Sequence, residues 1–531
     1  MKKFWRQGEP FIWGTAAALS ITLLLAATLL VVVMVNGLGV FWPSQVALAT
    51  LQDGSRVMGE LVRKEAIYQG EGERLQFKVG NRDLYGLDFR WVDEEQIARL
   101  EFPENAVVLE RQEYGNFYGM LSSVSLPAPA GEATDTWDLL DQAHALVEER
   151  MEVVEDIGDQ LTSLNIRMGK LRNRQLELKH GGRAPADAAL QQIENQMQQI
   201  REKFEGLVDR QNALLKELHE VTATFVSADG TEKVMEVANL VRYYRPNEMG
   251  LGEKVLFYLS KLGELILGEP REANTEGGLF PAIFGTVMLI FVMSLVSFPL
   301  GVLAAIYLRE YAKDGLIVRL VRIAVNNLAG IPSIVYGIFG LAFFVYGIGS
   351  SIDMLFFPER LPNPTFGTGG ILWASLTLSL LTVPVVIVST EEALGAIPAG
   401  VRDGSLALGA TKFQTLWRIL LPMASPGIMT GLILAMARAA GEVAPLMITG
   451  VVKLAPALPL DGNFPYLHLD RKFMHLGFHI YDIGFQSPNV EAAKPMVFVT
   501  TLLLVLIVLV MSSIAIHLRN KMKKRYTYRA F

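Results

Sequence analysis

The chain has 531 residues, of which 51% are hydrophobic, and its mean hydropathy of +0.31 excludes an ordinary soluble protein. Residues 42–280 carry a net charge of −15 and the rest of the chain +9, so an acidic soluble region is embedded in a basic membrane protein. The acidic region would repel phosphodiesters, which excludes nucleic-acid binding, and the absence of cysteine excludes disulfides and Cys-ligated metals.

Six apolar runs are long enough to cross about 30 Å of hydrocarbon as helices. They cover residues 12–36, 280–308, 317–349, 370–390, 426–450 and 495–517. Pro332 predicts a bend in the third span. The first run is longer than a usual signal-peptide core, so we expect an uncleaved anchor.

Four clusters of Lys and Arg fall on one side of the membrane if the six spans are correct, and basic flanks predict that this side is the cytoplasm. The clusters are Lys2/Lys3/Arg6, Arg309/Lys313/Arg319/Arg322, Arg402/Lys412/Arg418 and Arg519/Lys521/Lys523/Lys524/Arg525. In a bacterial inner membrane both termini would be cytoplasmic and residues 42–279 extracytoplasmic. The expected regions are 1–41 (tail and first span), 42–136, 137–222, 223–279, 280–518 (five spans) and 519–531 (basic tail).

Residues 42–136 are expected to form mainly β structure. The strand-like runs are VALATL, LQFKV and AVVLE. Turn signals at Asp53-Gly54, Gly70 to Gly72 and Gly80-Asn81 separate them.

Residues 137–222 place hydrophobic side chains at heptad spacing over 140–178 and again over 190–221. The Gly- and Pro-containing segment 180–187 separates the two runs. The pattern predicts an antiparallel coiled-coil hairpin about 60 Å long. Because heptads specify packing rather than chemistry, a rigid spacer or an oligomer contact is favoured over a ligand site.

Residues 223–279 are expected to complete an extracytoplasmic α+β domain. Asp229-Gly230 predicts a hairpin turn. Apolar residues at helical spacing over 251–267 predict a helix that lies along the membrane surface.

A charged segment, DGSLALGATKFQTLWRILLP (Asp403 to Pro422), lies between two apolar segments. Gly409 permits the positive φ of a tight turn, and Asp403 near a helix start would suit the helix macrodipole. The spacing from Gly409 to Ile419 and Pro422 resembles the EAA loop of permease subunits of ATP-binding-cassette importers, in which helix, turn and helix dock on an ATPase. The resemblance assigns the coupling role to Asp403, Gly404, Ser405, Gly409, Ala410 and Pro422, the first three standing in place of Glu-Ala-Ala.

Three more segments resemble the membrane subunits of phosphate-specific importers. They are NNLAGIPSIVYGIFGLA (Asn326 to Ala342), TEEALGAIP (Thr390 to Pro398) and ARAAGEVAPLMITG (Ala437 to Gly450). The resemblance covers about residues 280–517 and the first span, and leaves the large outer region unexplained. Many family members have Arg where this chain has Val388.

The resemblance implies a mainly α, polytopic MetI-like permease core with six transmembrane helices. It implies inorganic phosphate as substrate and half of a translocation path, with no cofactor. The implied partners are a cytoplasmic ATP-binding subunit dimer, a second related permease subunit, an extracytoplasmic phosphate-binding protein and membrane lipid. Another oxyanion such as molybdate or sulfate is the alternative substrate, and a membrane-anchored sensor or scaffold is the alternative of a different class.

Arg438 and Glu442 are four residues apart in the fifth predicted span, so they share a helix face near the bilayer midplane. Ionisable groups at such depth are usually functional, and the Arg fork suits phosphate because it donates two parallel hydrogen bonds. We therefore predict that Arg438 and Glu442 line the translocation path. The alternative is a buried ion pair that only fixes helix packing.

His468, His475 and His479 lie close together in a loop between spans. Because His475 and His479 lack the HExxH pattern, an exposed loop is expected rather than a metal site. The chain has no Walker A motif and no nucleophile elbow, so it is expected to be a transport subunit rather than an enzyme.

Overall fold

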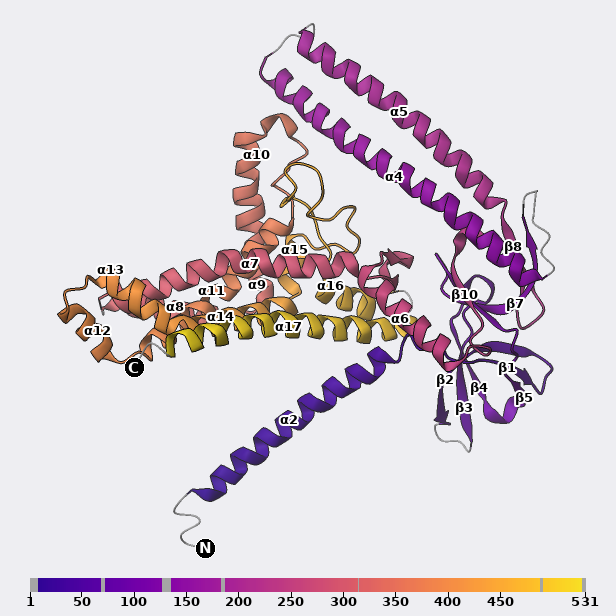
Figure 1. The fold of residues 1–531 in the computed structure, drawn as a ribbon, viewed down its shortest axis with the longest axis horizontal. Coiled ribbons are helices and arrows are strands. Elements are labelled where there is room, and N and C mark those ends of the chain that lie inside the picture. The colour runs from indigo at the N-terminus through magenta and orange to yellow at the C-terminus, as the bar shows by residue number, and fades with distance from the viewer. Residues whose placement is uncertain are drawn as a thin grey trace. The chain divides into compact units, whose positions relative to one another are not determined.

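The computed structural model describes residues 8–67, 72–126, 135–182, 187–313, 315–487 and 490–527, which form two compact units (Figure 1). The membrane unit comprises Met1–Val40, Leu265–Phe357 and Asn363–Phe531. The inserted unit comprises Phe41–Glu264 and Pro358–Pro362. Lys2, Lys3 and Arg6, Gly70 and Glu71 of the predicted Gly70 to Gly72 turn, and residues 183–186 of the predicted 180–187 turn lie outside the described residues.

The membrane unit is helical, and its described residues include six helical stretches long and apolar enough to span a membrane. Its helices are α2 (Glu9–Leu38), α7 (Phe280–Ile306), α8 (Leu316–Leu328), α9 (Ser333–Phe339), α10 (Ser350–Phe356), α11 (Ile371–Gly395), α12 (Ala399–Ala407), α13 (Lys412–Thr415), α14 (Leu421–Gly441), α15 (Ala444–Thr449), α16 (Leu476–Tyr481) and α17 (Val490–Thr527). Wider π turns occupy Tyr307–Tyr311, Gly340–Gly349, Leu416–Leu420 and Asp482–Gln486, and β11 (Pro270–Arg271) pairs with β12 (Glu276–Gly277). The predicted fold class, a six-span α-helical membrane protein with an additional β-containing region, is confirmed.

Helix α11 is the centre of the membrane unit, since it packs against both α7 and α14, and α14 packs against α17 (Figure 1). Most of its side chains are buried, including hydroxyls that hydrogen-bond to the preceding turn of the helix. Ser379 also donates a hydrogen bond to the carbonyl of Met293 on α7 at 3.0 Å. Such hydroxyls satisfy polar groups inside the apolar bundle.

The predicted boundaries of two spans are wrong. The third span is Ser333–Phe356, and α8 is a separate helix that ends before Pro332. The fifth span is Lys412–Gly441, after which the chain is extended at Glu442 before α15 begins. Proline explains both breaks, because it lacks an N–H and its ring clashes with the carbonyl four residues earlier; Pro332 precedes α9 and Pro445 lies in the first turn of α15.

The inserted unit contains two five-stranded antiparallel sheets. The first is built from β1 (Val46–Leu51), β2 (Arg56–Ala66), β3 (Glu73–Lys78), β4 (Phe89–Asp93) and β5 (Ile97–Glu101), and the second from β6 (Val107–Arg111), β7 (Phe117–Ser125), β8 (Thr222–Val226), β9 (Glu232–Glu236) and β10 (Leu240–Tyr244). β1, β3 and β6 coincide with the three strand-like runs in the sequence. The spatial orders are β4-β3-β2-β1-β5 and β9-β8-β7-β6-β10, so both sheets have the same topology.

The two sheets also repeat each other in detail. Gly59 on β2 pairs with β1, and Gly119 on β7 pairs with β6 at the equivalent position. A Cβ on Gly59 would lie 2.2 Å from the carbonyl oxygen of Lys78, and a Cβ on Gly119 would lie 2.7 Å from the carbonyl oxygen of Val226. In both sheets the register between the second and third strands shifts two residues after this glycine, after Leu61 in the first sheet and after Leu121 in the second. A 3-10 turn joins the fourth strand to the fifth in each. The inserted unit is therefore an internal repeat, although no pattern in the sequence predicts one.

Helices α4 (Thr136–His180) and α5 (Ala188–His219) interrupt the second sheet between β7 and β8 and run antiparallel to each other (Figure 1). The first sheet encloses its own core, which includes Phe77 and Val92. The core of the second sheet also contains Leu140, Ala143 and Val147 from the first turns of α4. The base of the α4–α5 pair is thus part of the second sheet's core.

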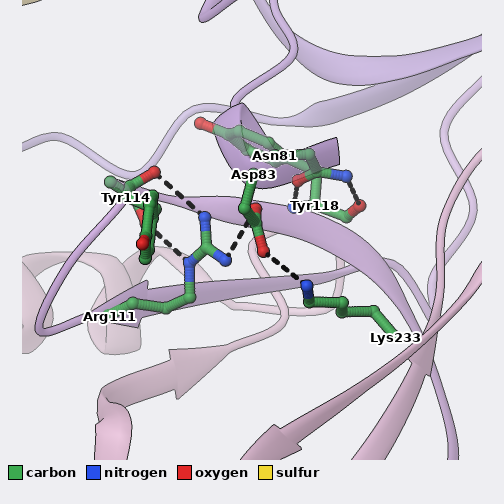
Figure 2. A network of polar contacts seen from close by, with 7 residues as sticks. Asn81, Asp83, Arg111, Tyr114, Tyr118 and Lys233 are labelled. Atoms are coloured by element: carbon green, nitrogen blue, oxygen red, sulfur yellow. Dashed lines mark hydrogen bonds and ion pairs between the residues drawn. The ribbon is translucent and has the colours of Figure 1, made fainter. Parts of the chain in front are cut away.

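A polar network from the turn and short helix α3 (Arg82–Tyr85) after β3 fastens the two sheets together (Figure 2). The side chain of Asn81 bonds both backbone groups of Tyr118, at 2.7 and 3.0 Å. Asp83 accepts from Arg111 at 2.9 Å and pairs with Lys233 at 3.1 Å. Although partial burial of Asp83 opposes ionisation, the hydrogen bond and charge of Arg111 lower the pKa of its carboxyl group.

Candidate functional site

The segment Asp403 to Pro422 folds as a helix, a tight turn and a second helix. Helix α12 ends at Ala407, and Gly409 has a φ of +86°, the left-handed backbone that its sequence position led us to expect. The Gly409 N–H donates to the Leu406 carbonyl, and the Ala410 N–H donates to that of Ser405. These bonds satisfy carbonyls left open at the helix end.

The second helix begins with a capping box. Thr411 accepts a hydrogen bond from the Gln414 N–H, and the Gln414 side chain bonds back to the Thr411 N–H. This arrangement satisfies two of the N–H groups that a helix start leaves unpaired. From Lys412 the chain stays helical to Gly441, so the second helix of the loop is the beginning of a membrane span.

Two buried hydroxyls join the helices across the turn. The Oγ of Ser405 lies 2.9 Å from the Oγ1 of Thr415, and both side chains are buried. Pro422 lies in the first turn of α14, directly after the π turn Leu416–Leu420. The missing N–H of proline is consistent with the wider turn before it.

The expectation that Asp403 lies near a helix start is wrong. α12 begins at Ala399, so Asp403 is in its middle, where the macrodipole has little effect. Asp403 and Gly404 are both exposed on this helix. Their place in the fold is therefore a surface position on the loop rather than a helix cap.

Arg402, one residue earlier, is the main anchor of the loop, although the sequence pattern marks it only as a member of a basic cluster. Its guanidinium pairs with Glu310, with Nη2 at 2.9 Å and Nε at 3.2 Å from Oε1. It also donates to the carbonyls of Leu394 at 2.6 Å and Ile397 at 2.8 Å, at the end of α11. One side chain thus connects α12, α11 and the π turn after α7, all by charge-assisted hydrogen bonds.

The loop presents an apolar surface, which we call the loop patch and define by Leu406, Leu408, Phe413 and Trp417. Leu408 is 91% exposed, and the stacked rings of Phe413 and Trp417 have centroids 6.3 Å apart. Large apolar groups gathered on a rigid surface usually mark an interaction site.

Arg438 and Glu442 do come together. The Arg438 Nε lies 3.6 Å from the Glu442 Oε1, and the two side chains are 33% and 21% exposed. The predicted mid-span position of Arg438 is wrong, because α14 begins before the predicted start and ends at Gly441. Arg438 is in the last turn of α14 and Glu442 is the extended residue that follows. At a helix C-terminus Arg is favoured by the macrodipole, whereas the Glu442 carboxylate is not.

The break around Glu442 is tightly packed. The neighbouring Ala439 and Ala440 belong to a buried cluster with Tyr336, whose hydroxyl donates to the Leu328 carbonyl at 2.7 Å. A Cβ on Gly337 would lie 2.7 Å from Pro445 Cα, so α9 approaches α15 closely. The charged pair is therefore held between packed helices while both side chains keep partial exposure.

The expectation of an exposed histidine loop is wrong. The side chain of His468 is only 14% exposed and lies 3.0 Å from the Oδ1 of Asp461. His475 and His479 are 1% and 2% exposed. His479 lies 2.9 Å from the Asn274 carbonyl and 3.1 Å from the Thr500 hydroxyl, whereas the Nε2 of His475 has no hydrogen-bond partner in the described part of the chain. Burial lowers the pKa of His475 to about 4. Burial also lowers the pKa of His479 to about 4, although its hydrogen bond to the Asn274 carbonyl acts in the opposite direction. The described residues hold no group of three potential metal ligands.

Comparison with known proteins identifies the family. A family model described as "binding-protein-dependent transport system inner membrane component" matches residues 297–524. The probable phosphate transport system permease protein PstA of Methanocaldococcus jannaschii is 34% identical over 221 residues, which cover 41% of this chain and 67% of the relative. The probable ABC transporter permease protein YqgI of Bacillus subtilis is 31% identical over 223 residues, which cover 41% of this chain and 70% of the relative.

The phosphate transport system permease protein PstA of Mycobacterium leprae is 36% identical over 194 residues, 36% of this chain and 58% of the relative. The chain thus spans from 58% to 70% of these three relatives. Among solved structures, an inward-facing MetNI methionine ABC transporter is 20% identical with a TM-score of 0.35, covering 46% of this chain and 95% of that one. This chain belongs to the family of binding-protein-dependent transport system inner membrane components, which are multi-pass permeases.

Proposed function

We propose that this chain is a membrane-spanning permease subunit of an ATP-driven importer of inorganic phosphate. Family membership supports the permease role, and relatives described as phosphate transport permeases support the substrate. The observation that carries the proposal is the loop itself, a rigid helix-turn-helix with an exposed apolar patch that continues directly into a membrane span.

The loop patch would bind a cytoplasmic ATPase subunit, one of two that hydrolyse ATP. Leu408, Phe413 and Trp417 would enter an apolar groove there, because burying each removes a large apolar surface from water. Since α13 runs without a break into α14, a movement of the ATPase would be passed to the span that ends at Arg438. Arg402 would transmit the same movement to α11 and α7 through its bonds to their ends.

Arg438 would contact the ion on its path. Its guanidinium is partly exposed and pairs with Glu442 at a distance longer than a direct hydrogen bond. A phosphate could therefore accept hydrogen bonds from the Arg438 nitrogens that the carboxylate leaves open. The nearby negative charge of Glu442 would limit the affinity, so that the ion can be released.

The remaining partners follow from this role. A second, related permease subunit would complete the path, and an extracytoplasmic binding protein would deliver phosphate. The termini and the loop would be cytoplasmic and the inserted unit extracytoplasmic, in agreement with the positions of the basic clusters.

The experiment is uptake of radiolabelled phosphate in cells that lack their own importer and receive this chain with its partner subunits. Wild type should take up phosphate in an ATP-dependent way, and an excess of unlabelled sulfate or molybdate should not compete. Competition by either of these ions, or no uptake by a fully assembled wild-type complex, would overturn the phosphate assignment.

Three variants separate a path role of Arg438 from a structural one. Arg438→Gln should abolish uptake at normal membrane abundance, whereas Arg319→Gln, at an exposed position of α8 outside the loop, should have little effect. The double variant Arg438→Gln/Glu442→Gln leaves no unpaired charge. It should remain inactive if Arg438 contacts the ion, and recovery of uptake would show that the pair only holds the helices together.

A further inference from the structure

Helix α6 (Leu251–Leu267) contacts the rest of the inserted unit with one face and exposes apolar side chains on the other. The bare side, which we call the α6 face, consists of Leu251, Val255, Leu256, Leu259, Ile266 and Leu267. These side chains recur at helical spacing, and Leu256 is 69% exposed. Large exposed apolar groups elsewhere in the inserted unit are more dispersed along the chain, so a row of this kind requires an explanation.

The opposite side of α6 is fixed to the inserted unit. The ring of Phe257 lies 4.4 Å from that of Tyr244 on β10. Lys261, whose side chain is only 12% exposed, pairs with Glu110 on β6 at 2.6 Å. The ring of Tyr258 also contacts that of Trp42, at 6.2 Å between centroids. These contacts prevent the helix from rolling, so it cannot turn its apolar face inward.

Both ends of the inserted segment lie close along the chain to membrane-spanning helices. At one end, the Leu265 carbonyl in the last turn of α6 accepts from the Leu279 N–H at 2.7 Å, and α7 begins at the next residue. At the other end, the span formed by α2 stops at Leu38, four residues before Trp42. Four residues of extended chain reach about 14 Å at most. Trp42 is therefore close to the membrane surface, and so is Tyr258 on α6, whose ring contacts that of Trp42.

We propose that α6 lies in the membrane surface, with the α6 face among lipid headgroups and the upper acyl chains. The occupant is lipid because α6 is joined at short range to two spans whose surroundings are lipid. A helix of this kind is expected to bury its apolar side about 5–10 Å into the headgroup region. Each large aliphatic side chain removed from water favours the buried position, so six of them on one face would hold the helix firmly. The inference does not depend on which ion is transported.

The test uses the full chain, purified alone and placed in phospholipid nanodiscs. Because the chain contains no cysteine, single variants can be labelled without background. Leu256→Cys and Leu259→Cys would carry a polarity-sensitive fluorophore, and Asn195→Cys, exposed on α5, would be the matched control. Labels at 256 and 259 should emit at shorter wavelength and be quenched by brominated lipids, whereas the label at 195 should show neither effect.

Two further results would decide against the proposal. Labels at 256 and 259 that behave like the control, with the chain alone and with partner subunits added, would overturn it. Labels that become protected only when a partner subunit is added would assign the α6 face to protein instead of lipid. As a check on folding, Leu251→Ser/Val255→Ser should reduce quenching of a label at Leu259→Cys without altering the far-ultraviolet circular dichroism.

Discussion

The hydroxyl oxygens of Ser405 and Thr415 lie 2.9 Å apart in a buried position, on opposite sides of the turn at Gly409. They connect the two helices of the loop directly, in addition to the backbone bonds of the turn. A bond of this type contributes about 0.5–1.5 kcal/mol, and losing one partner leaves the other buried and unsatisfied.

Ser405→Ala should therefore loosen the loop without displacing it. In the proposed phosphate importer we expect fewer ions transported per ATP hydrolysed, at unchanged membrane abundance. Thr415→Ser keeps the oxygen and is the control, whereas Thr415→Val should resemble Ser405→Ala. The double variant Ser405→Ala/Thr415→Val should be little worse than either single one, since both remove the same bond. Fully additive losses would show that the two hydroxyls act separately.

Arg402 should be much less tolerant of change. Arg402→Ala leaves the half-buried carboxylate of Glu310 and two helix-end carbonyls without their donor. Breaking such a pair by removing one partner costs about 3–5 kcal/mol. We expect a large decrease in the thermal stability of the purified chain, measured by light scattering on heating. Arg418→Ala removes a charge that makes no ion pair among the described residues and should change little. Equal stability of both variants would contradict the anchor role.

Acid should destabilise the fold through His475 and His479. Both have a pKa of about 4 in the folded chain, below the ordinary 6.5, so they fold in the neutral form. The unfolded chain binds protons more readily in this range. Stability is therefore complete above pH 6.5 and is lost as the pH falls toward 4, by up to about 1.4 kcal/mol per pH unit for each group. His475→Gln should flatten the profile of unfolding temperature against pH over this window, and an unchanged profile would argue against a buried neutral His475.

A Leu→Ala substitution should lower the free energy of unfolding by different amounts at different positions along α4. Leu140 is fully buried in the core of the second sheet, whereas Leu164 lies farther along the helix and is half-buried. Leu140→Ala should cost about 2–5 kcal/mol, and Leu164→Ala less. Proteolysis of the purified chain at increasing urea concentration would measure both, by the disappearance of the fragment that contains the inserted unit. A larger loss for Leu164→Ala would mean that the base of α4 is not part of the sheet core.

The sequence was most informative where the signal is local. Apolar length identified six spans, heptad spacing marked the segments that became α4 and α5, and Gly409 marked the turn of the loop. Span ends were less predictable, because Pro332 and Pro445 break helices inside continuous apolar runs. The Arg402 anchor depends on a partner distant in the chain, because Glu310 is 92 residues from Arg402.

The repeat in the inserted unit was missed for a similar reason. Its strongest sequence signals are two single glycines, Gly59 and Gly119, each within the longest strand of its sheet, and two acidic residues, Asp93 and Glu236, that precede the 3-10 turns. In the second copy α4 and α5 separate β7 from β8, so the two copies differ greatly in length. Only the strand order and register show that they are equivalent.

The position of α4 and α5 also has a kinetic consequence. The first sheet can form before the second is complete, because its strands follow one another closely along the chain. The second must join β7 to β8 across a long intervening segment, which carries a loop-closure cost. A helical hairpin forms from local contacts and brings its two ends together, so it would shorten the effective loop before the strands pair. The α4–α5 pair would then act as a folding scaffold for the sheet that it interrupts.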